Sequence, residues 1–351
     1  MHRTIVPLFS ALVAVACAKE PAPALPPSAP APAPAPAATS EAAPAAAPPK
    51  DDAAAKREQE LAKMREELEK DAAESSARWT PALRDKVSAL MDREWKTTKA
   101  ALTTILASEH RRPGNATRDV YRHPSEMLVF FGIKPNSRVF ELAQGQGWWT
   151  ELLAPLLAKH GKLSLIGANP DAKGTEGELR NRSVELFKSS AGNLYDKVEM
   201  VPQAGEAMVL GEPGSLDVVL VFRMFHNYHR AKRYDKVLPA IHAALKDRGV
   251  LAVEQHRAAE GADPDATAEK GYMPQKWLVE KIESYGFKLE KSSEMNANPK
   301  DTKDHPEGVW TLPPTLALGD KDRAKYEAIG ESDRMTLKFV KTSAKEPVKA
   351  K

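Results

Sequence analysis

Polar residues that could do chemistry follow two apolar runs of the sequence. The run LDVVLVF leads into Arg223 and His226, and the run VLAVEQH ends with Glu254 and His256. A histidine exchanges a proton near neutral pH, and a guanidinium holds an anionic group through parallel hydrogen bonds. We therefore expect His226, and after it His256, to serve as a base that removes a proton. Arg223 is expected to position an anionic substrate group, and Glu254 to orient a histidine.

Other interpretations of these histidines stay open. His226 could cap the helix that follows it or bond to the backbone. The H-x-x-H spacing of His226 and His229 would place both on one helical face, where His256 or Glu254 could complete a mixed metal site. The sequence has no H-E-x-x-H motif, and we assign no metal ligand from it.

A glycine turn, within VFELAQGQGWWT, lies between an apolar run and a helical pattern. Such a turn brings backbone N–H groups and a helix N-terminus to the edge of a sheet, where nucleotides bind. The dinucleotide motif G-x-G-x-x-G does not fit, because Thr150 stands where its third glycine belongs. The next apolar run, LSLIG, is followed by ANPD. Asn169 stands where the dinucleotide motif would have an acid, and the acid Asp171 comes two residues later. A nicotinamide enzyme is therefore disfavoured.

The same turn fits a second spacing. Glu141, Ala143, Gly145 and Gly147 match the pattern acid-x-G-x-G-x-G, with one glycine replaced by alanine. This pattern resembles the S-adenosylmethionine motif of class I methyltransferases. The resemblance implies that the acid lies near the methionine amino group and that the glycines let the backbone approach the ligand. Glycines that only permit close packing of strand and helix are the alternative.

Further blocks extend this resemblance over about two thirds of the chain. They are YRHPSEMLVFFGIKPNSRVFELAQGQGWWTELLAP, LDVVLVFRMFHNYHR, GVLAVEQHRA and a late block that runs from NANPKDTKDHPEGVW to MTLKFVK. Together they look like a group of predicted bacterial methyltransferases, many of them exported. The resemblance implies an α/β fold: a doubly wound, mostly parallel, seven-stranded methyltransferase-like (Rossmann-like) sheet with a reversed last strand.

The resemblance also implies a cofactor and a reaction. S-adenosylmethionine would be held by Glu141, Ala143, Gly145 and Gly147. Because the usual acid after the second strand is missing, the ribose hydroxyls would rely on Asn169, on the nearby Asp171 or on water. The reaction would be methyl transfer to a small-molecule or cell-envelope substrate.

Apolar runs and helical patterns alternate from Ser137 onward, as expected for a parallel sheet with helices on both faces. The predicted strands are residues 138–142, 162–167, 197–201, 216–222, 250–255, 288–293 and 335–341. The predicted helices between them are residues 149–159, 176–190, 231–246 and 274–285. Ligands of such sheets bind at the carboxyl ends of the strands, so the glycine turn and the polar residues should meet there.

Helices are also predicted ahead of the sheet. Residues 51–75 are dense in strong helix formers with Glu and Lys at supporting spacings, which favours a charged, solvated helix over a short coiled-coil contact. Residues 81–108 carry an apolar stripe and are expected to form one helix that docks on the following domain. This charged and docking region, 51–108, precedes a methyltransferase-like domain at 109–341 and a disordered tail at 342–351.

Two segments could add substrate contacts. One is the approach RDVYRHPSE, and the other is the connection 296–333, which is too long for an ordinary strand link and could form a lid or substrate wall. A structural arm packed on the sheet edge is the alternative for the second. The candidates are Tyr121, Arg122, His123, Asn298, Asp304, His305, Trp310 and Arg334.

The first residues have the pattern of an export signal, with Arg3, an apolar run and small residues before Cys17. Cys17 is the single cysteine of the chain, and its setting resembles a bacterial lipoprotein cleavage site. We expect a lipoprotein-type signal peptide at 1–17, lipidation at Cys17 and an Ala/Pro-rich disordered linker at 18–50. The protein would then be an exported cell-envelope lipoprotein on the periplasmic face of the outer membrane. An ordinary secretory signal is the alternative.

The overall charge argues against one class of partner. The 351 residues include 51 Lys and Arg against 48 Asp and Glu, a net charge of +3, which is too small to attract nucleic acid by bulk charge. Three functions stay open. They are an exported S-adenosylmethionine-dependent methyltransferase, a non-catalytic binding or assembly lipoprotein on the same fold, and a lyase or hydrolase that uses the His and Glu residues.

Overall fold

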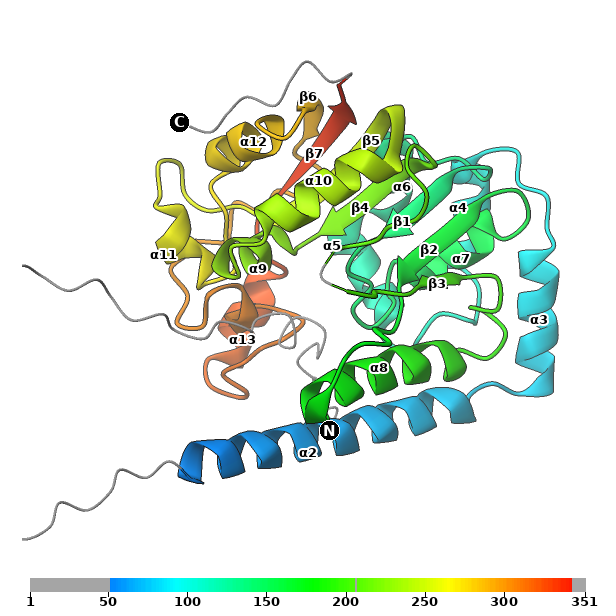
Figure 1. Cartoon of the computed structure of the whole chain (residues 1–351), viewed down its shortest axis with the longest axis horizontal. Helices are drawn as coiled ribbons and strands as arrows, with labels where there is room; N and C mark the ends of the chain where they lie inside the picture. The colour runs from blue at the N-terminus through cyan, green and yellow to red at the C-terminus, as the bar shows by residue number, and fades with distance from the viewer. Residues whose placement is uncertain (1–50, 206, 343–351) are drawn as a thin grey trace, which may run out of the picture.

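The computed structural model describes residues 51–205 and 207–342 (Figure 1). The expected signal peptide, the lipidation site Cys17 and the Ala/Pro-rich linker lie outside the described residues, as does the predicted tail beyond residue 342. In the described part of the chain, no helix combines the length and apolar character needed to cross a membrane.

Seven strands form one sheet in the order β3-β2-β1-β4-β5-β7-β6. The strands are β1 (Arg138–Glu141), β2 (Lys162–Ile166), β3 (Glu199–Val201), β4 (Leu216–Phe222), β5 (Leu245–His256), β6 (Phe287–Ser293) and β7 (Arg334–Lys341). β1 to β5 pair in parallel, whereas β7 is inserted antiparallel between β5 and β6. The predicted mostly parallel, seven-stranded sheet with a reversed last strand is confirmed.

Helices cover both faces of this sheet (Figure 1). Helices α3 (Pro81–Met91), α4 (Thr98–Leu106), α6 (Pro124–Phe131) and α7 (Thr150–Leu157) pack on one face. Helices α9 (Phe225–Arg230), α10 (Tyr234–Ala244) and α12 (Gln275–Glu283) pack on the other. The remaining elements are α2 (Asp51–Ala77), η1 (Asn115–Arg118), α5 (Asp119–Arg122), α8 (Gly174–Ser189), α11 (Pro264–Ala268), η2 (Gly308–Thr311) and α13 (Arg323–Ile329).

Strand β4 shows how the sequence builds these two cores. Successive side chains of a strand point to opposite faces. Val218 and Leu220 accordingly join the core that includes α4 and α7, whereas Val219 and Val221 join the core that includes α10 and α12. All four are nearly inaccessible to solvent. A strand that is apolar at every position except Asp217 is thus central, with its carboxyl end held in a fixed place.

The docking region differs from its prediction. Residues 81–108 form two helices rather than one, because the chain leaves helical geometry after Met91 and re-enters it at Thr98. Thr97 is extended and its hydroxyl accepts a hydrogen bond from Ala100 N, which caps the second helix. Both helices contribute buried residues to the hydrophobic core that also includes α6 and α7. This segment is therefore packed against the sheet domain.

Helix α2 is less solvated than its charge pattern suggests. It lies along α8 (Figure 1), with Leu61 and Ala72 buried. Its carboxylate Glu69 accepts two hydrogen bonds from Arg182 of α8, at 2.6 and 2.9 Å. The predicted charged surface helix therefore has one face that is covered by α8.

The strand order places the ligand site. It reverses between β1 and β4, since β2 and β3 follow β1 on one side while β4 and β5 lie on the other. In open α/β sheets, ligands bind at such a switch point, outside the carboxyl ends of the strands. Both the glycine turn after β1 and the polar residues after β4 lie at this edge.

Candidate active site

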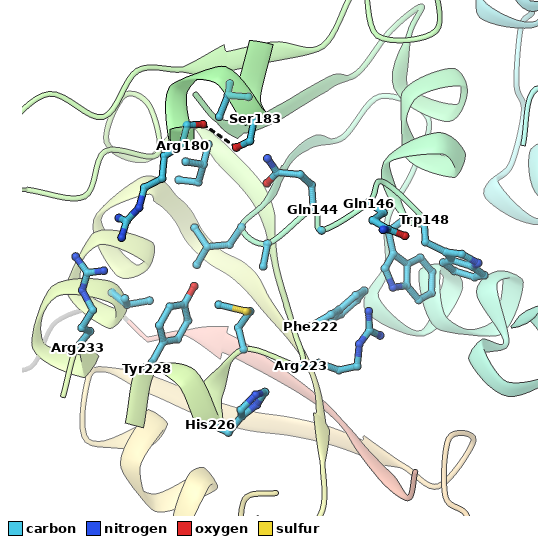
Figure 2. Close-up of a pocket in the computed structure, with 18 of the residues that line it drawn as sticks. Gln144, Gln146, Trp148, Arg180, Ser183, Phe222, Arg223, His226, Tyr228 and Arg233 are labelled. Carbon is cyan, nitrogen blue, oxygen red and sulfur yellow. Dashed lines mark hydrogen bonds between the residues drawn. The ribbon is translucent and has the colours of Figure 1, made fainter. Parts of the chain in front are cut away.

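A cavity of about 790 Å³ opens at the carboxyl ends of β1, β2 and β4. Small-ligand sites typically measure about 300–1,000 Å³. In Figure 2, Gln144 of the glycine turn projects into the space, with Arg180 and Arg233 on one side of the view and Arg223 and Trp148 on the other. The cavity therefore has two regions, which differ in composition.

The glycine turn contributes to the cavity unevenly. Ala143 and Gly145 line it. Gly145 has φ +53°, and a Cβ built on it would meet no atom within 4 Å. Gly147 has φ +83°, but its Cβ would lie 2.6 Å from Tyr195 Oη, so this glycine serves close packing. Gly145 thus fits the interpretation that the turn approaches a cofactor, and Gly147 fits the interpretation that the turn permits close packing.

Glu141 lies beneath the turn and outside the cavity wall. Its Oε2 accepts a hydrogen bond from Thr150 Oγ1 at 2.7 Å, and the side chain is buried. Burial raises its pKa to about 7, although the Thr150 hydrogen bond acts in the opposite direction. Glu141 is therefore bonded within the fold and lies behind the cavity wall rather than in it.

The end of β2 carries an amide where a ribose-binding acid would be expected. Asn169 lines the cavity, and its Oδ1 accepts a hydrogen bond from Asp171 N at 2.9 Å. Asn181 of α8 holds the backbone of Asn169 through two hydrogen bonds of 2.8 Å. Asp171 is exposed and accepts from Gly205 N. Its carboxylate is therefore used in the loop, and Asn169 remains the polar group at this position.

The ends of β4 and β5 meet as the sequence predicts. Phe222 pairs with Glu254 in the parallel register. Arg223, the next residue, has φ +56° and lines the cavity. Its Nη1 donates to Glu254 Oε2 at 2.7 Å, and Glu254 is fully buried. On the other side of Glu254, Arg334 Nε lies 3.1 Å from Oε1. The expectation that Glu254 orients a histidine is wrong, because its partners are two arginines.

His226 is held in one tautomer by Gln255. Gln255 Oε1 accepts from Phe225 N at 3.1 Å, which fixes its Nε2 as the donor. That nitrogen lies 3.3 Å from His226 Nδ1, so Nδ1 is the acceptor and Nε2 carries the proton. Burial also lowers the pKa of His226 to about 3. His226 lines the cavity with its Nε2–H as a donor, and this tautomer argues against the role of base expected for it.

His256 also lines the cavity, and its ring centroid lies 6.0 Å from that of His226. Its Nδ1 shares a hydrogen bond of 2.5 Å with Ser332 Oγ. Burial, and then the neighbouring His226 and Arg223, holds its pKa well below the ordinary value. Unlike His226, it has a hydroxyl partner that can accept as well as donate, so a neutral tautomer with Nε2 as acceptor is available to it.

The structure gives no support to the H-x-x-H metal interpretation. His229 Nε2 pairs with Asp265 at 2.7 Å, and its ring packs on Trp277, away from His226. Among the described residues, no group of three or more His, Cys, Asp or Glu side chains is arranged to hold a metal ion.

A second carboxylate, Glu331, is surrounded by arginines. Arg118 Nε donates to Glu331 Oε1 at 2.7 Å, Arg122 Nε lies 3.6 Å from Oε2, and Arg334 donates to Oε2. Although burial alone would raise the pKa of Glu331, the charges of these arginines hold it well below its usual range. We refer to the two carboxylates and their partners as the arginine cluster: Arg118, Arg122, Arg223, Arg334, Glu254 and Glu331.

The other substrate-side candidates divide into two groups. Arg122 and Trp310 line the cavity. The remainder have structural partners: His123 bonds to Asn296, Asn298 to the backbone of Ile329 and Glu331, and His305 to Asp301. Asp304 is bonded to Thr302, and the ring of Tyr121 lies against Gly330. The connection 296–333 is therefore partly a cavity wall and partly a packed arm.

Sequence reasoning missed several cavity residues. Arg118, Gln144, Glu331 and Ser332 all line the cavity, but none was singled out from the sequence. One signal was available, because Arg118 and Arg122 are four residues apart in a helical stretch and so share a face. Glu331 and Ser332 had no comparable signal, since only the fold brings them beside β4.

The chain is similar in fold to solved structures of other proteins. No protein-family model and no curated protein matches the chain. A solved S-adenosylmethionine-dependent methyltransferase from Aquifex aeolicus is similar over 68% of this chain and 98% of its own, with 14% identity and a TM-score of 0.41. The [4+2]-cyclase SpnF is similar over 69% and 93%, with 13% identity and a TM-score of 0.42. These likenesses concern the fold alone. The class I methyltransferase-like assignment rests on the strand order with its reversed β7.

Proposed function

We propose that this protein binds S-adenosylmethionine in the cavity and transfers its methyl group to a small-molecule or cell-envelope acceptor. The observation that carries the proposal is the place of the cavity. It lies at the switch point of the sheet, with Ala143 and Gly145 of the turn after β1 in its wall. Doubly wound sheets take nucleotide ligands at this position, where backbone N–H groups approach the ligand closely.

The residues around the glycine turn fit such a cofactor. Gln144 Nε2 is buried without a hydrogen-bond partner among the described residues, and Gln144 lines the cavity. A buried donor without a partner costs about 1–3 kcal/mol, which an acceptor on a ligand would offset. Gly145 leaves the space in front of it open, and Asn169 lies at the end of β2. These residues would hold the nucleoside and amino-acid parts of the cofactor.

S-adenosylmethionine supplies an electrophilic methyl group when it is bound. An oxygen or nitrogen acceptor must lose a proton as it takes this group. We assign that proton to His256, whose Nε2 is the acceptor in the tautomer that donates from Nδ1 to Ser332. His226, with its proton on Nε2, would donate a hydrogen bond to the acceptor and so orient it. Both rings are buried, and this keeps them neutral at pH 7.

A non-catalytic binding function is the second candidate, and one observation favours it. Glu141 is bonded to Thr150 and lies outside the cavity wall, so it offers no carboxylate to the positively charged methionine part of the cofactor. Under this alternative the cavity holds a different ligand, and the protein serves binding or assembly.

Titration calorimetry of the full chain with S-adenosylmethionine separates these candidates. We expect binding that is lost in Gly145→Val, because the new side chain enters open space at the cavity wall. His256→Ala should keep cofactor binding and lose turnover, whereas His226→Ala should raise KM for the acceptor with a smaller change in kcat. Absence of binding at millimolar cofactor by a folded chain would refute the methyltransferase proposal.

We also propose that the protein is an exported lipoprotein, as the pattern around Cys17 indicates. Metabolic labelling with a radioactive fatty acid in a bacterial host tests this. The wild-type chain should incorporate the label and fractionate with membranes, and Cys17→Ser should do neither. Labelling of both chains would place the lipid elsewhere, and labelling of neither would leave an ordinary secretory signal.

A further inference from the structure

We propose that Arg118, Arg122 and Arg223 form an oxyanion-binding site in the cavity, which holds a phosphate or carboxylate group of the ligand that reacts there. That this ligand is the methyl acceptor rests on the proposed function. The binding site itself does not, because it follows from the charge and the unused donors of the arginine cluster.

The charges of the cluster do not balance. Four guanidinium groups face two carboxylates, Glu254 and Glu331, which leaves two positive charges without a carboxylate. Other acids near the cluster have partners of their own: Asp119 pairs with Arg111, Asp333 with Arg257. Glu141, whose charge acts on Arg223, is bonded to Thr150, and burial raises its pKa to about 7. A guanidinium stays protonated in proteins, so this excess cannot be relieved by losing a proton. An anion bound in the cavity would relieve it.

The four arginines differ in how many donors they have left. Arg334 lies outside the cavity wall and is turned to other partners. Its Nη1 donates to Glu331 and its Nη2 to the backbone oxygen of Tyr121, while its Nε lies 3.1 Å from Glu254 Oε1 without hydrogen-bond geometry. Arg118 bonds to Glu331 through Nε, and Arg223 bonds to Glu254 through Nη1. The two Nη atoms of Arg118, and the Nε and Nη2 atoms of Arg223, take no part in these two bonds. Arg118 and Arg223 both line the cavity, so they can present donors to a ligand there.

Arg122 is the central member of the site. It is 3% exposed, it lines the cavity, and its Nε has no hydrogen-bond partner among the described residues. Its nearest carboxylate oxygen, on Glu331, is 3.6 Å away, which is too far for a hydrogen bond. Burial, followed by the charges of Arg118 and Arg223, lowers its pKa. A desolvated guanidinium beside two like charges is a strong site for an oxyanion.

The neighbouring polar atoms are also donors. Trp149 Nε1 and Gln144 Nε2 are buried without a partner in the described part of the chain, and both residues line the cavity. His226 carries its proton on Nε2 and lines the cavity as well. A ligand that satisfies these groups must be rich in acceptors, which a phosphate or carboxylate group is.

Titration of the full chain with inorganic phosphate and, separately, with acetate tests the site. Calorimetry should show binding of one anion or both, and the tighter one assigns the group. Arg122→Met and Arg223→Met should each weaken that binding about tenfold or more, since each removes a charged donor. Arg233→Met, on the other side of the cavity, is the matched control and should change it less than about twofold. The same loss in Arg233→Met as in Arg122→Met would overturn the proposal.

A second measurement uses the fluorescence of the wild-type chain. The Arg122 guanidinium lies over the ring of Trp148, 4.6 Å from its centroid. An anion that binds Arg122 will change the field at this ring, so phosphate should alter the tryptophan fluorescence of the wild-type chain in a saturable way. Trp148→Phe should lose most of that change. If neither phosphate nor acetate gives a heat or a fluorescence change at about 20 mM, where even weak anion sites fill, the site does not exist.

Two variants separate this inference from the proposed function. Gly145→Val should lose S-adenosylmethionine and keep phosphate, and Arg122→Met should do the reverse. Phosphate binding without any cofactor binding would refute the methyltransferase proposal and leave the anion site standing. Cofactor binding without any anion binding would refute the site alone.

Discussion

The two regions of the cavity are built in different ways. At the ends of β1 and β2 the wall presents backbone and neutral side chains such as Ala143, Gly145 and Asn169, with charged Glu176 and Arg180 added from α8. The motif acid Glu141 is buried beneath this region, bonded to Thr150. The region at the ends of β4 and β5 contains the arginine cluster and two buried histidines. The first region is suited to a nucleoside held by backbone contacts, and the second to a charged group held by donors.

This difference shows which region identifies the ligand. A backbone-lined turn recurs in many doubly wound folds, so it says little about the molecule it holds. The arginine cluster places charged groups out of water, and this costs free energy unless they are paired or bind a ligand. Its incomplete pairing therefore carries more information about the substrate than the glycine motif does.

The largest loss of stability is expected at Arg334, the member of the arginine cluster that pairs with both buried carboxylates. Arg334 is 2% exposed and separates Glu254 from Glu331. Arg334→Met leaves buried carboxylates short of a partner, so the free energy of unfolding should fall by about 3–5 kcal/mol. Guanidinium unfolding followed by circular dichroism measures this.

The control for that variant lies on the same strand. Lys338 pairs with Glu290 at 2.9 Å, and the two side chains are 16% and 31% exposed. Lys338→Met should cost less than about 1 kcal/mol, as partly exposed ion pairs do. Equal losses in the two variants would show that the cluster is no more structural than a surface pair.

Glu141 allows a pH test of the glycine region. Folding raises its pKa from 4.5 to about 7, first through burial. The folded state therefore binds this proton more tightly than the unfolded state. Burial of the ionised Glu141 carboxylate therefore lowers the free energy of unfolding. This loss is absent below pH 4.5, grows between pH 4.5 and 7 and is complete above pH 7, where it amounts to about 3 kcal/mol. Glu141→Gln should remove this dependence and be the more stable chain at pH 8. Parallel stability–pH curves for the two chains would contradict the assignment.

The two glycines of the turn should differ in cost. A methyl group on Gly147 would lie 2.6 Å from Tyr195 Oη and 3.0 Å from Phe187, both of which would have to shift. A methyl group on Gly145 would meet nothing within 4 Å. Both residues have positive φ, so the backbone strain is shared. Gly147→Ala should lower the free energy of unfolding by about 1–3 kcal/mol more than Gly145→Ala does. Thermal unfolding of the two variants measures this difference as a lower midpoint for Gly147→Ala. An equal decrease would mean that both glycines serve only the turn.

The fold was predictable because its signals are local. Strand β4 is apolar at every position except Asp217, and the glycine turn follows β1 directly in the sequence. The reversed β7 came from the resemblance rather than from any pattern in its residues. The break between α3 and α4 was not predicted, because the apolar stripe continues through Trp95, whereas α3 ends at Met91 and the cap at Thr97 begins a new helix.

The site was less predictable because its partners are distant in sequence. Arg223, Glu254 and both histidines were found from their places after apolar runs, but their roles depend on neighbours. Gln255 decides the tautomer of His226, and Glu331, more than 200 residues after Arg118, decides the geometry of that arginine. A spacing rule cannot give such contacts, since they form only when the sheet edge and the arm 296–333 come together.

The smallest expected effect, and a direct test of the glycine region, is a gain. Asn169→Asp would restore an acid at the end of β2, and its carboxylate can still accept the hydrogen bond from Asp171 N while a second oxygen faces the cavity. A carboxylate accepts hydrogen bonds from ribose hydroxyls at this position in doubly wound folds. It would also add one negative charge opposite a cationic cofactor. Affinity for S-adenosylmethionine should rise about fivefold, or about 1 kcal/mol.

The matched control for that gain is Asp171→Asn. Its carboxylate is exposed and already bonded to Gly205 N, so affinity should change less than about twofold. An unchanged affinity in Asn169→Asp, in a chain where Gly145→Val abolishes binding, would show that the ribose does not lie at β2. The nucleoside would then have to extend toward the arginine cluster, and the two regions would hold one ligand rather than two.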